Sequence, residues 1–385
     1  MNRQKTAEAS KSMAYFEWAM KSQKATTTAH LLELAKSDLK ATPEDFDADP
    51  WRLNCRNGTV DLKLGQLMSH SPQDMITKVA GCEFKPNAIA PQWDAFLNRV
   101  LGGSEALTTY LQKSVGYSLT GQTTEQCFFI LYGSGSNGKS TFTGMILEML
   151  GEYGGAIPSS LLTAQKFEQH PTVFADLFQL RMAVSSEVKS GSSWDEERLK
   201  GLSGGDRIKA RRMNENFWEF EPTHKLWLCV NHAPTTKDNS EGFWRRVRMV
   251  PFTTTIPKEE RDTNLQEKLR AELPGILAWA IKGCLLWQQE GLGTPKEVKD
   301  ATESYWGHQD PFGRFLKDVC ERPGRGDGIF QVQSKDLLSA QHDWALNNEE
   351  RQLSSKELKA AASEHGIHSK RSDGMQYQGI RLKRA

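Results

Sequence analysis

Apolar residues run without interruption through several short segments of the chain, and these segments predict buried strands. Cys127–Tyr132 is such a run, and Thr141–Leu150 after it has helical character. Leu180–Glu187 and Leu226–Asn231 are two more runs, each ending in a polar side chain, and a fourth strand follows Arg246. The middle of the chain is therefore predicted to be an α/β domain with a parallel sheet.

Hydrophobic spacing and turn residues predict the elements on either side of this domain. Upstream we expect two helices within residues 7–39, a small antiparallel β unit at 51–80, and helices at 91–101 and 104–117. Downstream we expect helical sequence at 264–290, helices at 296–306, 311–320, 335–347 and 355–365, a strand at 330–333 and a hairpin at 366–383. The predicted domains are a small α+β region at 1–120, a core at 121–292 and a C-terminal domain at 293–385.

A glycine loop joins the first of these strands to its helix, with the spacing G-x-x-x-x-G-K-S. The loop consists of Gly133, Ser134, Gly135, Ser136, Asn137, Gly138, Lys139, Ser140 and Thr141. Small residues let backbone N–H groups turn toward a phosphate, and the helix N-terminus adds partial positive charge. Lys139 is predicted to neutralise the β- and γ-phosphates and Ser140 to hold Mg²⁺. The loop predicts binding of a nucleoside triphosphate and leaves the use of its energy open.

The other predicted strands end in residues that suit phosphate chemistry. Glu187 is placed to polarise a water or to support Mg²⁺, although strand-end acids are common. Asn231 suits contact with a γ-phosphate or the attacking water, and the alternative is a capping role before Pro234. Arg245 and Arg246 are suited to stabilising a phosphoryl group from a neighbouring subunit, or to forming a surface ion-pair site.

Residues 207–220 alternate around a polar turn and predict a β-hairpin. The first arm carries four cations, Arg207, Lys209, Arg211 and Arg212, and the second carries aromatic residues. Cations that follow phosphates and rings that stack bases suit single-stranded nucleic acid. The alternative is a solvated charged arm that packs through Ile208, Phe217 and Phe220.

Overall charge and composition exclude some classes of protein. The net charge is +1, so a nucleic-acid site must come from local clusters of cations. The six cysteines are scattered and contain no C-x-x-C pair, which favours reduced core thiols in a cytoplasmic protein. The N-terminus has no apolar signal-peptide region, and the most apolar late stretch, Leu273–Trp287, is too short to span a membrane.

The C-terminal elements follow the order of a winged helix-turn-helix. Residues 351–385 contain eight Lys/Arg and three Asp/Glu, a local net charge of +5. This charge suits contact with duplex DNA at an origin or fork. Winged helices also dock proteins, so the residues leave both roles open.

Together the motifs resemble those of the superfamily 3 helicases, and more closely the helicase portion of the phage and plasmid primase–helicase family, which is related to the poxvirus nucleoside triphosphatase. The matching stretches are Gly133–Thr141, the strand to Glu187, Gly204–Asp206 with Lys209 and Arg211, the strand to Asn231, and Trp244–Arg246. Upstream, Asp49–Gly58 and Gly116–Gly121 resemble the region before the helicase core. Ser186 departs from the family, where a second acid is more usual, and the family's primase half is absent from the expected organisation.

This resemblance implies an AAA+-like ATPase that assembles as a ring, usually a hexamer, and moves along one DNA strand from 3′ to 5′. By position, Lys139 and Ser140 bind phosphate and Mg²⁺, Glu187 activates water, and Asn231 senses the γ-phosphate. Either Arg245 or Arg246 is the finger that reaches the ATP of the next subunit. The hairpin at 207–220 is the element that tracks DNA.

The expected function is that of an ATP-driven ring helicase that acts on single-stranded or forked DNA in replication of a phage, plasmid or integrated element. A separate primase or replication-initiation protein is an expected partner, and no membrane is involved. The main alternative is a DNA-binding ATPase switch, such as a loader or defence component, that does not unwind processively. A small-molecule kinase is a more distant alternative, because no acceptor-substrate pocket is evident in the sequence.

Overall fold

The computed structural model describes residues 2–383 except 40, 168, 187, 189–190, 237–239, 324–329 and 373. The chain forms two compact units. One consists of Met1–Ala48 and Pro72–Thr77, and the other of Asp49–Ser71 and Lys78–Ala385.

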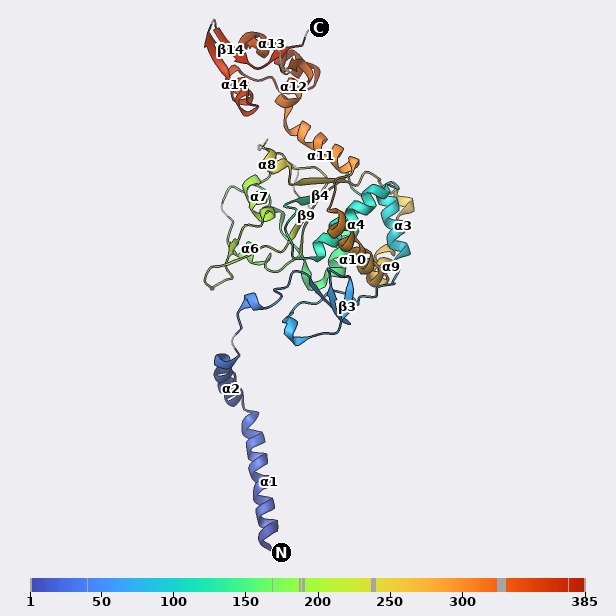
Figure 1. Ribbon diagram of the computed structural model, residues 1–385, viewed down its shortest axis with the longest axis vertical. Coiled ribbons are helices and arrows are strands. Elements are labelled where there is room, and N and C mark those ends of the chain that lie inside the picture. Colours follow the sequence, from blue (N-terminus) through green and yellow to red (C-terminus); the bar gives the residue numbers. More distant parts are fainter. Residues whose placement is uncertain are drawn as a thin grey trace. The chain divides into compact units, whose positions relative to one another are not determined.

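The first unit is helical. Helices α1 (Asn2–Ser22) and α2 (Ala25–Asp38) confirm the two helices predicted within residues 7–39, although α1 begins earlier (Figure 1). Large apolar side chains on both helices are exposed, among them Phe16 and Trp18 on α1 and Leu34 on α2. Packing within this unit therefore leaves much of its apolar surface exposed.

The second unit is built on a five-stranded sheet, and all four pairings between its strands are parallel. Its strands are β4 (Phe128–Tyr132), β5 (Gly154–Ala156), β6 (Met182–Ser186), β9 (Lys225–Val230) and β10 (Val247–Pro251), in the order β10-β4-β9-β6-β5. The prediction of a parallel α/β core is confirmed. Since β9 lies between β4 and β6, the carboxyl ends of these three strands meet at one edge of the sheet.

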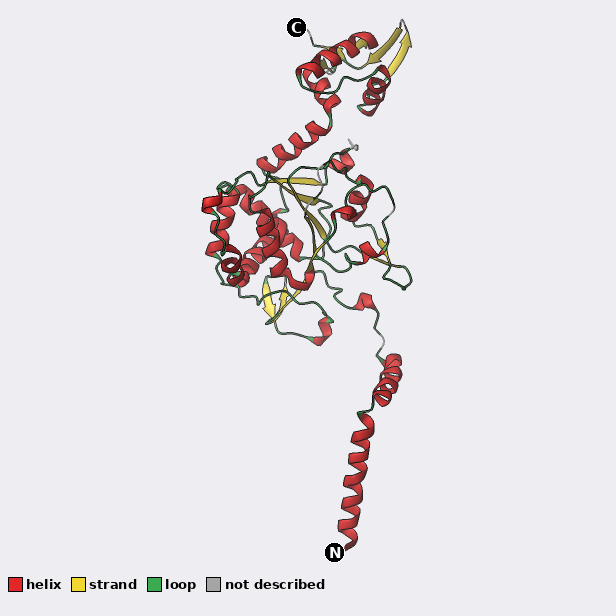
Figure 2. Cartoon of the chain, turned by 180° about the vertical axis from the view of Figure 1, so that it is seen from behind, coloured by secondary structure: helices red, strands yellow, loops and turns green. Residues whose placement is uncertain are grey.

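Successive side chains of the central strands enter two different cores. Phe129, Leu131 and Trp227 face one core, whereas Phe128, Ile130 and Leu228 face the other. The first core contains side chains of α3 (Pro91–Val100), α4 (Glu105–Leu119), α5 (Lys139–Leu150), α9 (Leu265–Ala271) and α10 (Leu273–Glu290). The second contains side chains of α7 (Glu196–Gly204), α8 (Glu241–Trp244) and α11 (Lys296–Gln309). Figures 1 and 2 show the helices divided between the two sides of the sheet.

The sequence at 264–290 forms two helices because the chain breaks at Glu272. Pro274 lies in the first turn of α10, where its missing N–H leaves no intrahelical bond unmade. Helix α10 packs along α4, and Gly116 and Gly283 lie at their contact. A Cβ on Gly116 would lie 2.1 Å from the Cys284 nitrogen, so the close approach of the two helices requires glycine there.

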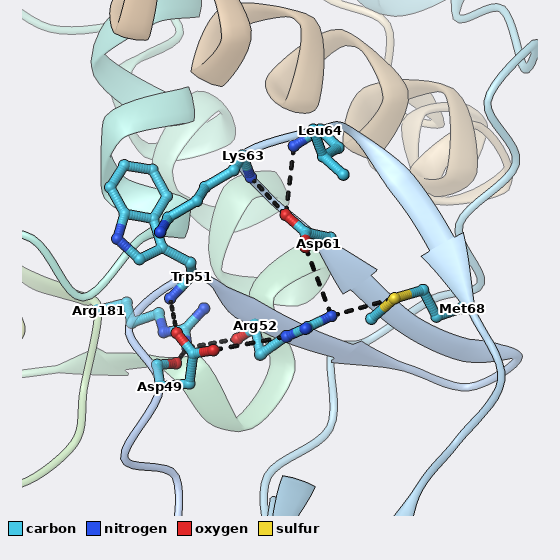
Figure 3. A network of polar contacts seen from close by, with 8 residues as sticks. All are labelled: Asp49, Trp51, Arg52, Asp61, Lys63, Leu64, Met68 and Arg181. Carbon is cyan, nitrogen blue, oxygen red and sulfur yellow. Dashed lines mark hydrogen bonds and ion pairs between the residues drawn. The ribbon is translucent and has the colours of Figure 1, made fainter.

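A small antiparallel sheet, β1 (Arg52–Cys55), β2 (Gly58–Asp61) and β3 (Gln66–Met68), confirms the β unit predicted at 51–80. Arg52 pairs with the carboxylates of Asp49 and Asp61 at 3.4 and 3.6 Å (Figure 3). The guanidinium of Arg181, just before β6, donates to the backbone oxygens of Asp49 and Arg52. These bonds tie the small sheet to the amino end of the parallel sheet.

The predicted hairpin is present as β7 (Ile208–Ala210) and β8 (Trp218–Phe220), paired antiparallel. Helix α6 (Thr172–Ala175) contacts β7. Ile208, Ala210 and Phe220 are buried under the hairpin, whereas its turn is exposed. The hairpin is thus anchored through apolar side chains and presents its polar tip to solvent.

The C-terminal elements form a core of their own from the side chains of α12 (Pro311–Val319), α13 (Ser334–Asn347) and α14 (Ser355–Glu364) and of the strands beside them. The strands are β11 (Cys320–Glu321), β12 (Gln331–Gln333), β13 (Ser369–Ser372), β14 (Gly374–Gln378) and β15 (Arg381–Leu382). This order confirms the predicted succession of strand, two helices and hairpin. Within the described residues, no helix has both the length and the apolar character needed to cross a bilayer.

Candidate nucleotide site and nucleic-acid interface

The glycine loop turns from β4 into α5 at the carboxyl edge of the sheet, as predicted. A Cβ on Gly133 would lie 2.1 Å from the Phe252 carbonyl oxygen, and one on Gly138 would lie 2.6 Å from Val100 Cγ1. Gly138 also has a φ of +85°. Only glycine fits at these two positions, because any side chain would clash with neighbouring backbone or core.

Lys139 lies inside this loop and is buried. Its Nζ donates to the Gly133 carbonyl at 2.7 Å, to Asn137 Oδ1 at 2.9 Å and to Asn231 Oδ1 at 3.1 Å. Asn137 in turn donates to the Phe252 carbonyl at 3.0 Å. Burial lowers the pKa of Lys139 from its ordinary value. The loop therefore holds a desolvated cation whose acceptors are neutral oxygens.

These features fit a bound phosphate. A Cβ on Gly135 would meet no atom within 4 Å, so the loop is open where a phosphate would approach its backbone. The side chain of Ser140, in the first turn of α5, is exposed and suits a Mg²⁺ ligand. Ser134 is also exposed, and Ser136 and Thr141 are available at the surface of the loop. An anion here would be met by the N-terminus of α5 and by Lys139.

Asn231 and the strand that leads to Glu187 reach the same edge of the sheet. Asn231 directly follows β9, and its side-chain oxygen contacts Lys139 across the β4–β9 pair. Glu187 lies outside the described residues, and the strand before it ends at the exposed Ser186. The structure thus brings together Lys139 and Asn231, and it leaves the position of the predicted water-activating carboxylate undescribed.

The two predicted finger candidates have different environments. Arg246 is half-buried, and its guanidinium donates to the Gly242 carbonyl. Burial and the neighbouring Arg245 charge lower the pKa of Arg246, and Asp206 opposes them. Arg245 is exposed, and within the described residues its side chain has no hydrogen-bond or ion-pair partner. Arg246 therefore has a local structural contact that Arg245 lacks.

The four cations predicted on the hairpin line its arms and lie close to aromatic rings. Lys209 and Arg211 approach the ring centre of Phe217 at 5.2 and 5.1 Å, and Arg212 lies 5.2 Å from that of Trp218. Arg207 instead donates to the Glu219 carbonyl at 3.1 Å. The exposed Lys209 and the partly buried Arg211 over a half-exposed Phe217 combine the two kinds of contact that single strands use.

A loop that the sequence reasoning missed lies beside the hairpin. The Nε2 atom of His170 is 3.4 Å from an Nη atom of Arg211. Phe167, in the same loop, is 85% exposed. No local pattern pointed to this loop, because its position beside the hairpin depends on the packing of α6 against β7.

Sequence reasoning also missed a cavity of about 390 Å³ beside the glycine loop. Six of the residues that line it are Gln92, Phe96 and Arg99 of α3, Ser136 and Gly138 of the loop, and Ile256. Its volume and its contact with the loop suit the base and sugar of a nucleotide. The apolar spacing of α3 predicted only its buried residues, whereas Gln92 and Arg99 are exposed and lie at the edge of that face, beside the buried Phe96.

Taken together, the described residues have the geometry expected of a phosphate-binding loop, and comparisons show which known proteins the chain is similar to. A family described as "D5 N terminal like" matches residues 1–102, and a family of unknown function, DUF5906, matches residues 131–246. The chain is 25% identical over 327 residues to "Putative helicase L207/L206" of Acanthamoeba polyphaga mimivirus, which covers 79% of the chain and 34% of that protein. It is 25% identical over 265 residues to "Putative helicase 022R" of Frog virus 3, covering 63% of the chain and 27% of that protein.

Solved structures show a similar fold. An apo structure of the NrS-1 C-terminal region matches with a TM-score of 0.57 and 11% identity, and the match covers 92% of this chain and 91% of that one. The chain spans about a third of the length of the viral relatives. The predicted resemblance is confirmed as a distant similarity: residues 1–102 match the "D5 N terminal like" family, and the chain is similar to viral proteins named "Putative helicase".

Proposed function

We propose that the chain is the ATP-hydrolysing motor of a DNA helicase that assembles as a ring. One observation carries this proposal: Lys139 of the glycine loop contacts Asn231 of the neighbouring strand, 3.1 Å away. A cation that touches both phosphate loop and strand-end amide is placed to respond to the γ-phosphate. The relationship to viral proteins named as helicases supports the choice of DNA as the substrate on which the motor acts.

Each residue of the site takes a distinct role in this proposal. Lys139 and the N–H groups of the loop bind the phosphates of ATP, and the Ser140 hydroxyl contributes to Mg²⁺ binding. Mg²⁺ supplies positive charge that offsets charge developing on the phosphates. Asn231 orients the attacking water or contacts the γ-phosphate, and Glu187, from its position after β6, accepts the proton of that water. The cavity beside α3 holds the base and ribose.

Arg245 is the finger that reaches the neighbouring subunit's ATP. Its exposed guanidinium has no partner within the described residues, so it can bind a phosphate without breaking a contact of its own fold. Arg246 instead holds the Gly242 carbonyl and supports helix α8. The finger role requires a ring, and a homohexamer is the assembly that the family resemblance favours.

Several finer features belong to the same proposal. The strand order β10-β4-β9-β6-β5 supports an AAA+-like core, and the C-terminal elements support a winged-helix-like domain. The hairpin at 207–220, with Phe167 beside it, tracks one DNA strand from 3′ to 5′. The motor serves replication of a phage, plasmid or integrated element, together with a primase or initiation protein.

The test measures ATP hydrolysis by wild type and Lys139→Ala, with and without single-stranded DNA, while the oligomeric mass is determined in the same buffer. We expect hydrolysis by a hexamer-sized particle that DNA stimulates and that the substitution lowers by roughly 100-fold or more. Strand displacement on a forked duplex should need ATP and be lost in the same variant. Hydrolysis by a monomer that ignores DNA, or hydrolysis without strand displacement, would contradict the helicase proposal.

The finger is tested by mixing subunits. Lys139→Ala subunits retain Arg245 and lack hydrolysis, and Arg245→Ala subunits retain Lys139. Mixed rings should regain part of the activity, because one interface then combines an intact loop with an intact finger. Arg246→Ala is the matched control, and it should lower thermal stability without being rescued by mixing. Rescue of Arg246→Ala instead would assign the finger to that residue.

A further inference from the structure

The two helices of the C-terminal pair differ in the charges that they expose. Helix α13 and the turn after it expose Asp336, Asp343 and Glu349 beside one lysine, Lys335, whereas the exposed acid of α14 is Glu364 at its last position. On α14 the exposed positions in its middle are Lys356, Lys359, Ala360 and Ser363, which share one side of the helix by their spacing of three and four residues. A helix face with cations and small side chains, and with no exposed large apolar residue, is suited to approach a phosphate backbone.

The carboxylate that follows Lys356 in the sequence, that of Glu357, is already engaged. Glu357 accepts from the Ser354 backbone N–H at 2.9 Å and from its hydroxyl at 2.7 Å, which completes a capping box at the start of α14. It also pairs with Arg351. Lys356 and Lys359 therefore have no ion-pair partner within the described residues.

Two more exposed cations, Lys370 and Arg371, lie on β13, which begins five residues after α14 ends. Figures 1 and 2 both show α14 beside the β13–β14 hairpin. In the part of the chain that the structure describes, neither cation has an ion-pair partner. Other arginines of this domain are used internally: Arg314 pairs with Glu350, and Arg381 pairs with Glu321 at 2.8 Å. Four exposed cations without an ion-pair partner among the described residues thus lie on one helix and the strand next to it, while Lys317 on α12 and Lys335 on α13 are single exposed lysines elsewhere in the domain.

From this arrangement we propose that α14 and β13 form a duplex-DNA site, separate from the hairpin at 207–220. Helix α14 has ten residues, about 15 Å of helix, and a major groove about 12 Å wide admits such a helix. Lys370 and Arg371 on the adjacent strand contact the phosphates that flank the groove. The site gives the chain a hold on double-stranded DNA that does not depend on ATP hydrolysis.

The same features favour duplex DNA over two other occupants of this face, single-stranded DNA and a docking protein. Single strands are bound by exposed rings that stack bases, and α14 carries no such ring. The hairpin at 207–220, in contrast, places Lys209 and Arg211 over the ring of Phe217. A docking protein would need exposed apolar anchors on this face. The exposed large apolar side chains of the domain, Leu346 and Met375, lie on α13 and β14 instead.

The experiment uses the full chain without nucleotide and follows fluorescence anisotropy of a labelled duplex of about two helical turns. Saturating unlabelled single-stranded DNA is present, so that the hairpin at 207–220 is occupied. Variants are Lys356→Ala/Lys359→Ala and Lys370→Ala/Arg371→Ala. The matched control is Lys296→Ala/Lys299→Ala, two exposed lysines on α11 that pair with Asp300 and Glu303.

We expect the wild type to bind the duplex despite the competitor, and each double variant to bind it roughly tenfold more weakly. The slope of log affinity against log salt should fall by about 2 in each variant, as expected when two phosphate contacts are lost. Hydrolysis stimulated by single-stranded DNA should be unchanged, which separates this site from the motor. Complete displacement of the duplex by single strands, or equal duplex affinity in variants and control, would overturn the proposal.

Discussion

The two ends of the parallel sheet each contain a buried lysine with three oxygen acceptors, and the acceptors differ. At the carboxyl end, Lys139 contacts one carbonyl and the side-chain oxygens of Asn137 and Asn231. At the amino end, Lys225 donates to the backbone carbonyls of Thr120, Gln122 and Thr223, and its Nζ lies 4.9 Å from the ring centre of Tyr117. Burial lowers the pKa of both lysines, and for Lys225 the charge of Arg181 adds to the effect.

The difference shows which cation is available for binding. An amide side chain can rotate away from Lys139 when a phosphate approaches, because other groups can satisfy it. The three acceptors of Lys225 are main-chain carbonyls, one of them at the C-cap of α4, and they cannot rotate away as an amide side chain can, so Lys225 is committed to the fold. The same residue type is thus buried at both ends, and we propose that it binds phosphate at the carboxyl end and stabilises the fold at the amino end.

The largest expected effect comes from a substitution at the amino end of the parallel sheet. Lys225→Met removes the donor for three carbonyls and should lower the free energy of unfolding by about 3 kcal/mol. Denaturant unfolding measures this loss, and Lys299→Met, at an exposed site on α11, is the control with little expected change. Hydrolysis per folded molecule should stay near the wild-type rate. An unchanged midpoint would show that Lys225 does not hold these carbonyls.

A smaller effect is expected from a substitution at the carboxyl end of the parallel sheet. Asn231→Ala removes one acceptor of Lys139 and the amide proposed to face the γ-phosphate. Hydrolysis should fall about 30-fold, equivalent to about 2 kcal/mol in the barrier, while nucleotide affinity and stability change little. Single-turnover hydrolysis measures the rate and a fluorescent-nucleotide titration measures the affinity. Asn98→Ala, at an exposed position, is the control. Loss of affinity with an unchanged single-turnover rate at saturating nucleotide would assign Asn231 to ground-state binding only.

The smallest expected effect is the pH dependence of folding stability that His224 causes at the amino end of the sheet. His224 precedes Lys225 and is fully buried, and burial together with the Lys225 charge lowers its pKa from 6.5 to about 3. The unfolded chain takes up a proton below pH 6.5 while the folded chain stays neutral, so stability falls as pH drops from 6.5 toward 3. Between about pH 7.5 and 5.5 this contribution is about 1.4 kcal/mol.

His224→Leu should remove this pH dependence, whereas His70→Leu, at an exposed position, should leave it intact. Urea unfolding at both pH values measures the difference. The same acid dependence in wild type and His224→Leu would show that other groups cause it.

Much of the fold was predictable because its signals are local. Unbroken apolar runs identified β4, β6 and β9, and the glycine spacing located the turn into α5. The short strand β5, with the sequence Gly154–Ala156, lacked such a run and was not predicted. Its place in the sheet comes from pairing with β6, a strand that lies well beyond it in the sequence.

The predicted site likewise has contacts that follow from local spacing and contacts that only the fold creates. The contact of Lys139 with the loop follows from spacing, whereas its contact with Asn231 bridges 92 residues and needs β9 beside β4. The sequence could not separate Arg245 from Arg246, because adjacent residues differ only in which way the fold turns them. The cavity beside α3 was missed because its walls come from distant segments.

By itself the sequence determined the spacing of the glycine loop, the type of most helices and strands, and the resemblance to superfamily 3 helicases. These depend on glycine conformations, apolar periodicity and short spacings, all of which act between near neighbours. Only the tertiary structure decided the strand order, the different acceptors of Lys139 and Lys225, and the unpaired cations on α14 and β13 among the described residues. Burial and partner choice depend on segments far apart in the chain, and folding alone brings those together.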